Sequence, residues 1–300
     1  MDFLSKFGSV SNQTAALIVF LAAYISAWMT VFVMEGGFAV AVGFTGTIFL
    51  AVLVFMSLMY VLSRALRRTD VVDVAWGPAF VLAAVTAWLV SPASYVVGWN
   101  SQTLVTLLVV VWAARLSVTI GLRFASKPED RRYVELRRRW KGSVALNTYL
   151  RIFVVQALLA TLIATAMNLI HFSDEAPIGG FAVAGLLIWL TGFFFEAVGD
   201  WQLRQHLARP ESKGKLMTSG LWRYTRHPNY FGEAAMWWGV FVIGFEVDYG
   251  WLGIITPVLI TYLLIFVSGV PMTERAFQAR PGWKAYKRRT SMFLPLPPRV

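Results

Sequence analysis

The densest group of side chains that could do chemistry lies in the segment GLWRYTRHPNYFGE, residues 220–233. Five polar residues of different types gather there: Arg226, His227, Asn229, Tyr230 and Glu233. Pro228 lies among them, and proline is favoured at the first position of a helix because its missing N–H is not needed there. A helix N-terminus offers free N–H groups and partial positive charge, which favour phosphate binding. An interfacial anchor needs only an aromatic and a basic residue, so this mixture favours a functional site.

A second polar group occurs in FFFEAVGDWQLRQHL, residues 193–207. Glu196, Asp200 and Arg204 recur every four residues, so they share one face of a helix. A charge at the bilayer centre costs roughly 2.5–3.5 kcal/mol on insertion scales, which makes such residues informative. The segment predicts either an ion pair between Asp200 and Arg204 near the interface or a polar stripe that enters a helix bundle.

Further charged residues lie in the C-terminal tail and inside two apolar segments. The tail contributes Glu274, Tyr286, Arg288 and Arg289, which suit lipid headgroups and a ligand equally well. Arg115 lies within the apolar segment WAARL and needs a partner. Asp73, in TDVVDVAWG, is its acidic counterpart or an acid on the substrate side. Asp70 in the same segment fits a helix N-cap.

These residues must be positioned by transmembrane helices. Of the 300 residues, 57% are hydrophobic and 14% are charged, and the mean hydropathy is +0.61; soluble domains carry about 25% charged residues. A helix needs roughly 20 apolar residues to cross the hydrocarbon core. The sequence predicts eight such spans, at about 14–34, 38–63, 71–90, 102–123, 150–171, 180–203, 229–246 and 251–269. The first run is too long for a secretory signal peptide.

The distribution of positive charge predicts the orientation. All 27 lysine and arginine residues, from Lys6 to Arg299, lie at the N-terminus, in the segments after every second span or near the cytoplasmic ends of the spans. The charged residues in the connections on the opposite side are all acidic, such as Asp174 and Asp248. By the positive-inside rule, we expect both termini, all long loops and any cofactor site to be cytoplasmic. Basic residues beside apolar spans set membrane topology more often than they bind nucleic acid.

Several kinds of chemistry are excluded by composition. The chain has no cysteine, which excludes disulfides, thiol catalysis and zinc held by cysteine. The three histidines, at 171, 206 and 227, are too scattered to suggest a metal site. No G-x-G-x-x-G follows a strand, so a Rossmann module is not expected.

The segments GLWRYTRHPNYFGE, FFFEAVGDWQL, SGVPMTE and YKRRTSMFLP together resemble the steroid 5-alpha-reductase superfamily. DVVDVAWG and PEDRRYVELRRRW are similar to its bacterial, mostly uncharacterised branch, so the resemblance covers residues 64–298. It implies an all-α bundle of seven transmembrane helices in residues 38–300, with residues 1–37 as an additional N-terminal helix. For a bacterial member it also implies the inner membrane.

The resemblance further implies NADPH as the cofactor, bound in a cytoplasmic cavity by the later helices and loops. The residues assigned to this role are Arg115, Asp200, Arg204, Tyr224, Arg226, His227, Asn229, Tyr230, Glu274, Tyr286 and Arg288. Steroid 5-alpha-reductases polarise a ketone with a glutamate and a tyrosine from early helices. The second span here has Ser57 and Tyr60 but no acid, and Asp73 begins the next span.

The resulting hypothesis is an NADPH-dependent membrane reductase of a carbon–carbon double bond conjugated to a carbonyl, in a lipophilic substrate. Glu233 and Asp73 are the candidate acids that polarise the carbonyl as charge develops on its oxygen. The alternative is a membrane methyltransferase that uses S-adenosylmethionine, since such enzymes share an RHP turn. The surplus of arginine favours NADPH, which carries phosphates. A transporter or lipid-binding protein is a third alternative, although no internal repeat supports it.

Overall fold

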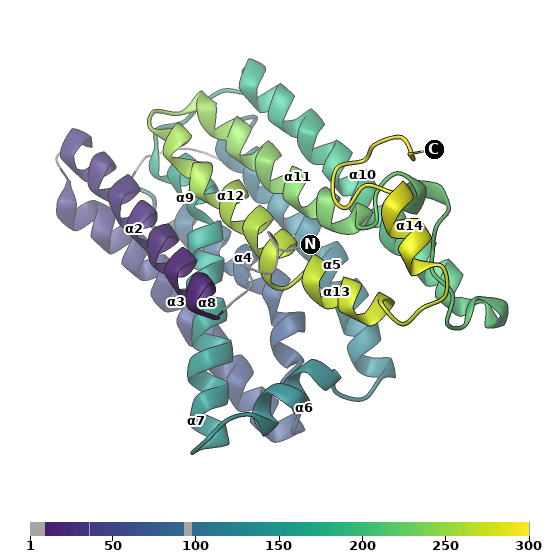
Figure 1. Ribbon diagram of the computed structural model, residues 1–300. Coiled ribbons are helices and arrows are strands. Elements are labelled where there is room, and N and C mark those ends of the chain that lie inside the picture. Colours follow the sequence, from purple (N-terminus) through teal and green to yellow (C-terminus); the bar gives the residue numbers. More distant parts are fainter. Residues whose placement is uncertain (1–9, 36, 93–97, 300) are drawn as a thin grey trace. The chain divides into compact units, whose positions relative to one another are not determined.

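The computed structural model describes residues 10–35, 37–92 and 98–299, and this part of the chain is helical with no strand. Its α-helices, several of them labelled in Figure 1, are α2 (Val10–Glu35), α3 (Phe38–Leu66), α4 (Val71–Leu89), α5 (Ser101–Ser126), α6 (Arg131–Arg138), α7 (Val144–Thr148), α8 (Val155–Ile163), α9 (Thr165–Phe172), α10 (Gly180–Ala208), α11 (Pro228–Ile243), α12 (Ile255–Tyr262), α13 (Val270–Phe277) and α14 (Trp283–Arg289). Two π-helical turns, Tyr149–Val154 and Leu263–Val267, extend α7 and α12. The all-α prediction is confirmed.

Seven helical segments in the described residues are long and apolar enough to cross a membrane. They are Thr14–Met34, Ala39–Leu66, Val71–Leu89, Ser101–Ser126, Val144–Ile163, Gly180–Ala208 and Gly250–Phe277. The predicted span 229–246 differs, because α11 has only 16 residues. At about 1.5 Å per residue it is about 24 Å long, which is shorter than the hydrocarbon core of roughly 30 Å.

The chain forms two compact units that interleave along the sequence. The first unit comprises Met1–Ala22, Gly180–Ile243 and Thr256–Val300, and the second comprises Ala23–Gly179 and Gly244–Ile255. The division at residue 37, which follows from the family fold, stays a prediction. Lys6, part of the topology argument, lies outside the described residues.

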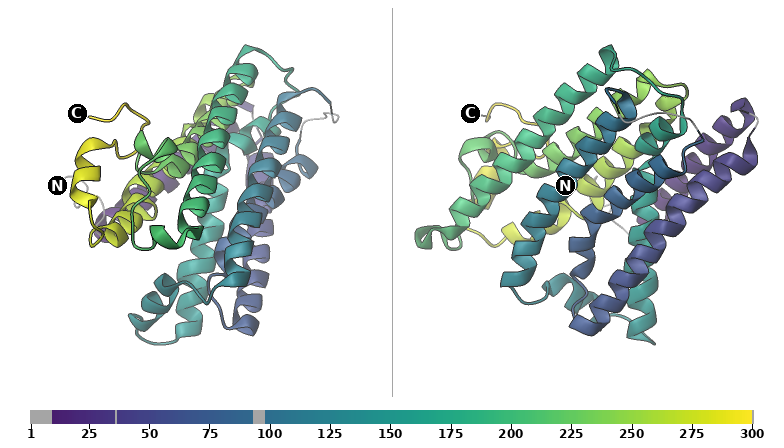
Figure 2. Two further views of the ribbon diagram at one scale, coloured as in Figure 1. Left: turned by 90° about the vertical axis from the view of Figure 1, so that its right-hand side faces the viewer. Right: turned by 180° about the vertical axis from the view of Figure 1, so that it is seen from behind.

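The second unit is built on α4, which packs against α3 and α5 (Figure 2). Gly77 permits the close approach of α4 to α5, because a Cβ atom there would lie 2.8 Å from Ser117 Oγ. Phe80 and Trp112 meet edge to face across the same contact, with ring centroids 5.3 Å apart. This contact fixes the ends of α4 and α5, where Asp70, Asp73 and Arg123 lie.

The first unit is organised by the pairing of α10 with α11, which run side by side (Figure 1). Glycines on both helices let the backbones touch: a Cβ atom on Gly192 would lie 2.5 Å from the carbonyl oxygen of Gly232. One on Gly239 would lie 2.6 Å from the carbonyl oxygen of Gly185. This seam holds the beginning of α11 beside the last turns of α10, so residues of the two sequence motifs become neighbours.

Candidate functional site

The turn that precedes α11 is built around the buried guanidinium of Arg226. Its side chain is only 5% exposed, and Nε and Nη2 donate to Oε1 of Glu274 over 2.9 and 2.7 Å. Nη1 donates to the backbone carbonyls of Lys287 and Thr290, over 3.1 and 2.5 Å. A buried charge is tolerated only when it is paired and hydrogen-bonded, and Arg226 meets both conditions.

The C-terminal segment is bonded to the same turn along its length. The hydroxyl of Tyr286 donates to the carbonyl of Trp222 over 2.6 Å. The backbone N–H of Arg226 donates to the carbonyl of Ser291 over 2.9 Å. Thr225 Oγ1 donates to the carbonyl of Phe293 over 2.8 Å. Burial raises the pKa of the Tyr286 phenol, which therefore keeps the proton that this hydrogen bond needs.

The first turn of α11 presents an amide to α10. Asn229 Nδ2 donates to Asp200 Oδ1 over 3.2 Å, which brings together two residues predicted to bind one cofactor. Asn229 Oδ1 is buried and has no hydrogen-bond partner in the described part of the chain. A buried carbonyl oxygen without a donor is costly, so this atom is a candidate acceptor for a ligand N–H or O–H.

His227 and Tyr230 form a stacked pair beside this amide. Their ring centroids lie 5.2 Å apart with planes inclined by 9°, and the Tyr230 hydroxyl pairs with Thr273 Oγ1 at 2.9 Å. His227 is 1% exposed, and its Nε2 lies 3.6 Å from Glu274 Oε1. Burial lowers the pKa of His227, although the neighbouring carboxylate of Glu274 opposes that shift.

The other residues predicted in the first unit lie around this core. Arg204, at the end of α10, and Tyr224 and Arg288 are exposed. Glu233 lies one turn beyond Asn229 on α11 and is half-buried. The structure therefore gathers Asp200, Asn229 and Tyr230 at the start of α11 and leaves arginines on the surface of the same unit.

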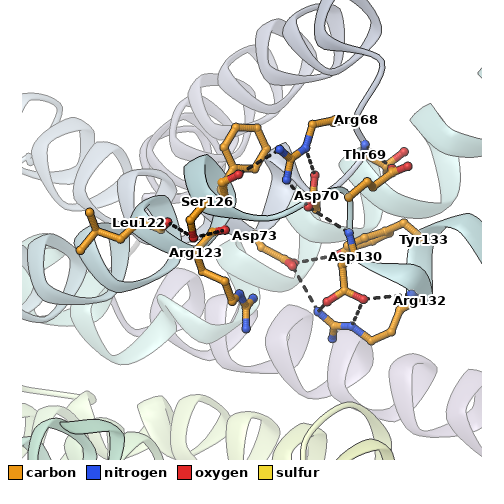
Figure 3. Close-up of polar contacts among 12 residues, drawn as sticks. Arg68, Thr69, Asp70, Asp73, Leu122, Arg123, Ser126, Asp130, Arg132 and Tyr133 are labelled. Atoms are coloured by element: carbon orange, nitrogen blue, oxygen red, sulfur yellow. Dashed lines mark hydrogen bonds and ion pairs between the residues drawn. The ribbon is translucent and has the colours of Figure 1, made fainter. Parts of the chain in front are cut away.

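Two predicted residues, Asp73 and Arg115, belong to the second unit. Asp73 Oδ1 accepts the Tyr133 hydroxyl over 2.5 Å, and Oδ2 accepts Arg132 Nη2 over 3.2 Å (Figure 3). Arg132 also contacts Asp130, whose side chain caps α6 by accepting from the N–H of Arg132 over 2.9 Å. Arg115 is half-buried on α5. Asp73 is thus held by α6, a helix that follows α5.

Two ion-paired carboxylates, Asp70 and Glu129, fix the start of α6 to the residues before α4 by accepting backbone N–H groups across this contact. Asp70 occupies the N-cap position of α4 as expected, but its carboxylate binds Arg68 over 2.9 Å instead of capping the helix. Glu129 binds Arg137 and accepts the backbone N–H of Thr69 over 2.6 Å. Burial opposes ionisation of Glu129, but these donors outweigh it and hold its pKa below the usual value.

A cavity of about 90 Å³ opens beside Asp73. Its walls are Arg68, Asp70, Asp73, Ile120, Arg123, Phe124, Lys127, Pro128 and Asp130. Burial and the adjacent Asp73 carboxylate raise the pKa of Tyr133 well above its ordinary value, so the phenol is protonated at neutral pH. The cavity therefore brings together three carboxylates and three cations, and the Tyr133 phenol is hydrogen-bonded to Asp73 in its wall. Cations at such a cavity can polarise a carbonyl-type group.

Several partners of these residues were not predicted from the sequence. Tyr133 and Arg132 lie about sixty residues beyond Asp73, and Thr273 and Lys287 lie in the tail. Separations of this size carry no periodic signal, because the partners come from different helices. Only the mixture of aromatic and charged residues in the segment RRYVELRR marks α6 as unusual.

A helical fold with seven membrane-length helices and polar clusters at helix ends defines a multi-pass membrane protein. The chain belongs to the DUF1295 family of proteins of unknown function, whose model matches residues 59–290. This family is steroid 5-alpha-reductase-like. An uncharacterised protein of Schizosaccharomyces pombe (C594.04c) is 22% identical in an alignment of 260 residues, and the match covers 76% of this chain and 73% of the relative. No solved structure matches the chain.

Proposed function

We propose that the protein is an NADPH-dependent reductase of a carbon–carbon double bond conjugated to a carbonyl, in a lipophilic substrate. The observation that carries the proposal is the amide of Asn229, which is bonded to Asp200 on one side and has an unused, buried carbonyl oxygen on the other. Together with the steroid 5-alpha-reductase-like family, this group supports a nucleotide site at the start of α11.

The polar and charged side chains of the first unit fit the groups of NADPH. Asn229 and Asp200 offer acceptors for the N–H and O–H groups of a carboxamide or a ribose. Arg204 and Arg288 are exposed cations that suit phosphates, and Tyr224 is an exposed aromatic residue between them in sequence. When bound, NADPH would supply a hydride to the β carbon of the conjugated double bond. Arg115, in the second unit, stays a predicted cofactor ligand.

The acid is proposed to be Asp73 together with Tyr133, or Glu233. The reduction needs a donor at the carbonyl oxygen and a proton at the α carbon, to balance the hydride at the β carbon. Tyr133 keeps its proton at neutral pH, and Asp73 and Arg132 orient it. This single phenolic proton is donated to Asp73 in the absence of substrate, and it would turn to a substrate oxygen bound beside Asp73, on which negative charge develops.

The first experiment is mass spectrometry of the molecules that co-purify with the detergent-solubilised protein, followed by titration with NADPH. We expect a bound dinucleotide, with affinity reduced on the order of tenfold in Asn229→Ala, as for loss of a hydrogen bond in a buried site. Gln205→Ala, an exposed change on α10, is the matched control and should bind as the unmodified protein does. Co-purified S-adenosylmethionine without NADPH affinity would instead identify a methyltransferase.

The phosphate ligands and the acid need separate variants. If Arg204 or Arg288 binds the 2′-phosphate, its replacement by alanine should lower the affinity for NADPH more than the affinity for NADH. Arg209→Ala, at an exposed position, is the control and should lower neither affinity. Once a substrate is found, Tyr133→Phe and Asp73→Asn should lower turnover while leaving NADPH affinity unchanged. Full turnover in Tyr133→Phe, Asp73→Asn and Glu233→Gln would rule out all three candidate acids.

A further inference from the structure

The carboxylate of Glu274 on α13 is saturated by protein donors. Oε1 accepts Nε and Nη2 of Arg226, and Oε2 accepts Nζ of Lys287 over 3.2 Å. His227 Nε2 lies 3.6 Å from Oε1, and the Glu274 side chain is 12% exposed. A carboxylate whose two oxygens are already occupied, and which is nearly buried, has little capacity left for a ligand.

These contacts join three short elements that could not hold their positions alone. Glu274 lies on α13, which has 8 residues, and Lys287 lies on α14, which has 7. Arg226 lies in the turn before α11, and its remaining nitrogen bonds the carbonyls of Lys287 and Thr290. Helices this short are marginal in isolation, so their positions depend on tertiary contacts of this kind.

The residues around Glu274 also border the first turn of α11, where Asn229 lies. The residue before Glu274, Thr273, pairs with the Tyr230 hydroxyl, and the Tyr230 ring stacks on His227. Tyr230 in turn follows Asn229, the residue with the unused carbonyl oxygen. Thr273 therefore contacts the first turn of α11 and Glu274 contacts the turn before it, so a displacement of Glu274 is expected to shift Asn229, which lies between these two points.

We propose that Glu274 is a positioning residue: it fixes the turn that carries Arg226 and His227 against the C-terminal segment, and thereby presents Asn229 and Tyr230 to the nucleotide without contacting it. The nucleotide in this statement rests on the proposed function. The positioning itself is a property of the chain and can be measured without any ligand.

The ligand-free test is hydrogen–deuterium exchange in the purified full-length protein. Glu274→Gln keeps the shape of the side chain and removes its charge, and Glu211→Gln, an exposed change in the same unit, is its matched control. We expect faster exchange in peptides that cover residues 226–232 and 283–290 in Glu274→Gln only. Unchanged exchange in both segments would overturn the positioning role, whatever the protein binds.

The test with ligand is a double-mutant cycle for NADPH affinity. Glu274→Gln should raise the NADPH dissociation constant roughly tenfold, the size expected for a charged hydrogen bond lost from a support. Because Glu274 is proposed to act through Asn229, the effect should nearly vanish in the Asn229→Ala background. Additive effects would make Glu274 a direct ligand and overturn the proposal. Absence of NADPH binding in the unmodified protein would overturn the proposed function, and the exchange measurement would still decide the positioning role.

A milder variant guards against failure of Glu274→Gln to fold. Lys287 Nζ donates to Oε2 of Glu274 and lies 5.7 Å from the centroid of the Trp283 ring, and its side chain is 41% exposed. Lys287→Met therefore removes one donor to Glu274 and leaves the Arg226 contact intact. Lys287→Met should speed hydrogen exchange in residues 283–290 and lower the affinity for NADPH, in both cases by less than Glu274→Gln does. If Lys287→Met changed exchange and NADPH affinity equally in the unmodified protein and in the Glu274→Gln background, the proposed coupling of Lys287 to Glu274 would be contradicted.

Discussion

Arg226 directs two of its nitrogens, Nε and Nη2, at a single oxygen of Glu274, over 2.9 and 2.7 Å. Its third nitrogen, Nη1, bonds two backbone carbonyls of the tail. The planar guanidinium is suited to this use because its donors point in fixed directions. The arginine of the RHPN segment is therefore the point at which the C-terminal segment is attached to the turn before α11.

We expect replacement of Arg226 to destabilise the protein strongly. Arg226→Ala leaves the nearly buried Glu274 with Lys287 as its main charged partner, and loss of one member of a buried pair costs about 3–5 kcal/mol. Arg226→Lys should recover only part, because an ammonium cannot reach both the carboxylate and the two carbonyls. Thermal unfolding can be followed by tryptophan fluorescence in detergent, with the exposed Arg223→Ala as control. Equal melting temperatures for the two alanine variants would contradict this account.

The contact of α10 with α11 predicts a steric effect at Gly232. A Cβ atom there would lie 2.5 Å from the backbone N of Glu196 and from the carbonyl oxygen of Gly192. Gly232→Ala should therefore lower the stability by about 1–3 kcal/mol, the usual cost of overpacking. Gly180→Ala, at the start of α10 with no atom within 4 Å of the new Cβ, should not. If both variants melt like the unmodified protein, the two backbones do not touch as described.

Glu129 predicts a pH dependence of stability. Its pKa is lowered in the folded state because the donors from Arg137 and Thr69 outweigh the effect of burial. A group with a depressed pKa stabilises the fold above its unfolded pKa, about 4.3, and this contribution is lost as the pH falls through the folded value. Glu129→Gln should therefore lower the melting temperature at pH 7, by an amount equivalent to about 1 kcal/mol for a partly exposed group. The difference from the unmodified protein should shrink below about pH 4.3.

The control for Glu129 lies on the following helix. Glu135 is exposed on α6, so Glu135→Gln should have little effect at either pH. A loss of stability in Glu129→Gln that is independent of pH would mean that the amide is sterically unsuited to the site, and that the charge is not what stabilises it.

The sequence was sufficient for the features that depend on local composition. Runs of apolar residues located the seven membrane-length helices, and Pro228 marked the beginning of α11. The four-residue spacing within α10 and the composition of the segment at α11 singled out Asp200 and Asn229, and these two side chains do meet. Their role in binding stays a prediction. What the spacing could not show is that α11 has only 16 residues, because the apolar run continues beyond it into residues 244–246, which leave the α-helical conformation.

Partner choice was not predictable from spacing. Arg226 looked like a phosphate ligand because it precedes a helix N-terminus, yet its donors are used by Glu274 and by backbone carbonyls in the tail. Asp73 was interpreted as a partner for Arg115 or an acid on the substrate side, and it accepts hydrogen bonds from Tyr133 and Arg132. In both cases the decisive residue comes from a distant segment, and a single sequence contains no signal for such a pairing.

The orientation of the chain in the membrane is a prediction that its composition makes easy to test. The protein has no cysteine, so single cysteines can be introduced without background. By the positive-inside rule, Arg139→Cys, Lys213→Cys and Lys284→Cys should be cytoplasmic, whereas Trp99→Cys and Asp174→Cys should face the other side. All five positions are exposed, so a membrane-impermeant maleimide will report their side of the membrane and not their burial.

In cells with an intact cytoplasmic membrane, only Trp99→Cys and Asp174→Cys should react before lysis. Reaction of Lys213→Cys or Lys284→Cys would place the start of α11 and the tail outside, where NADPH is not available, and the reductase proposal would fail with the topology.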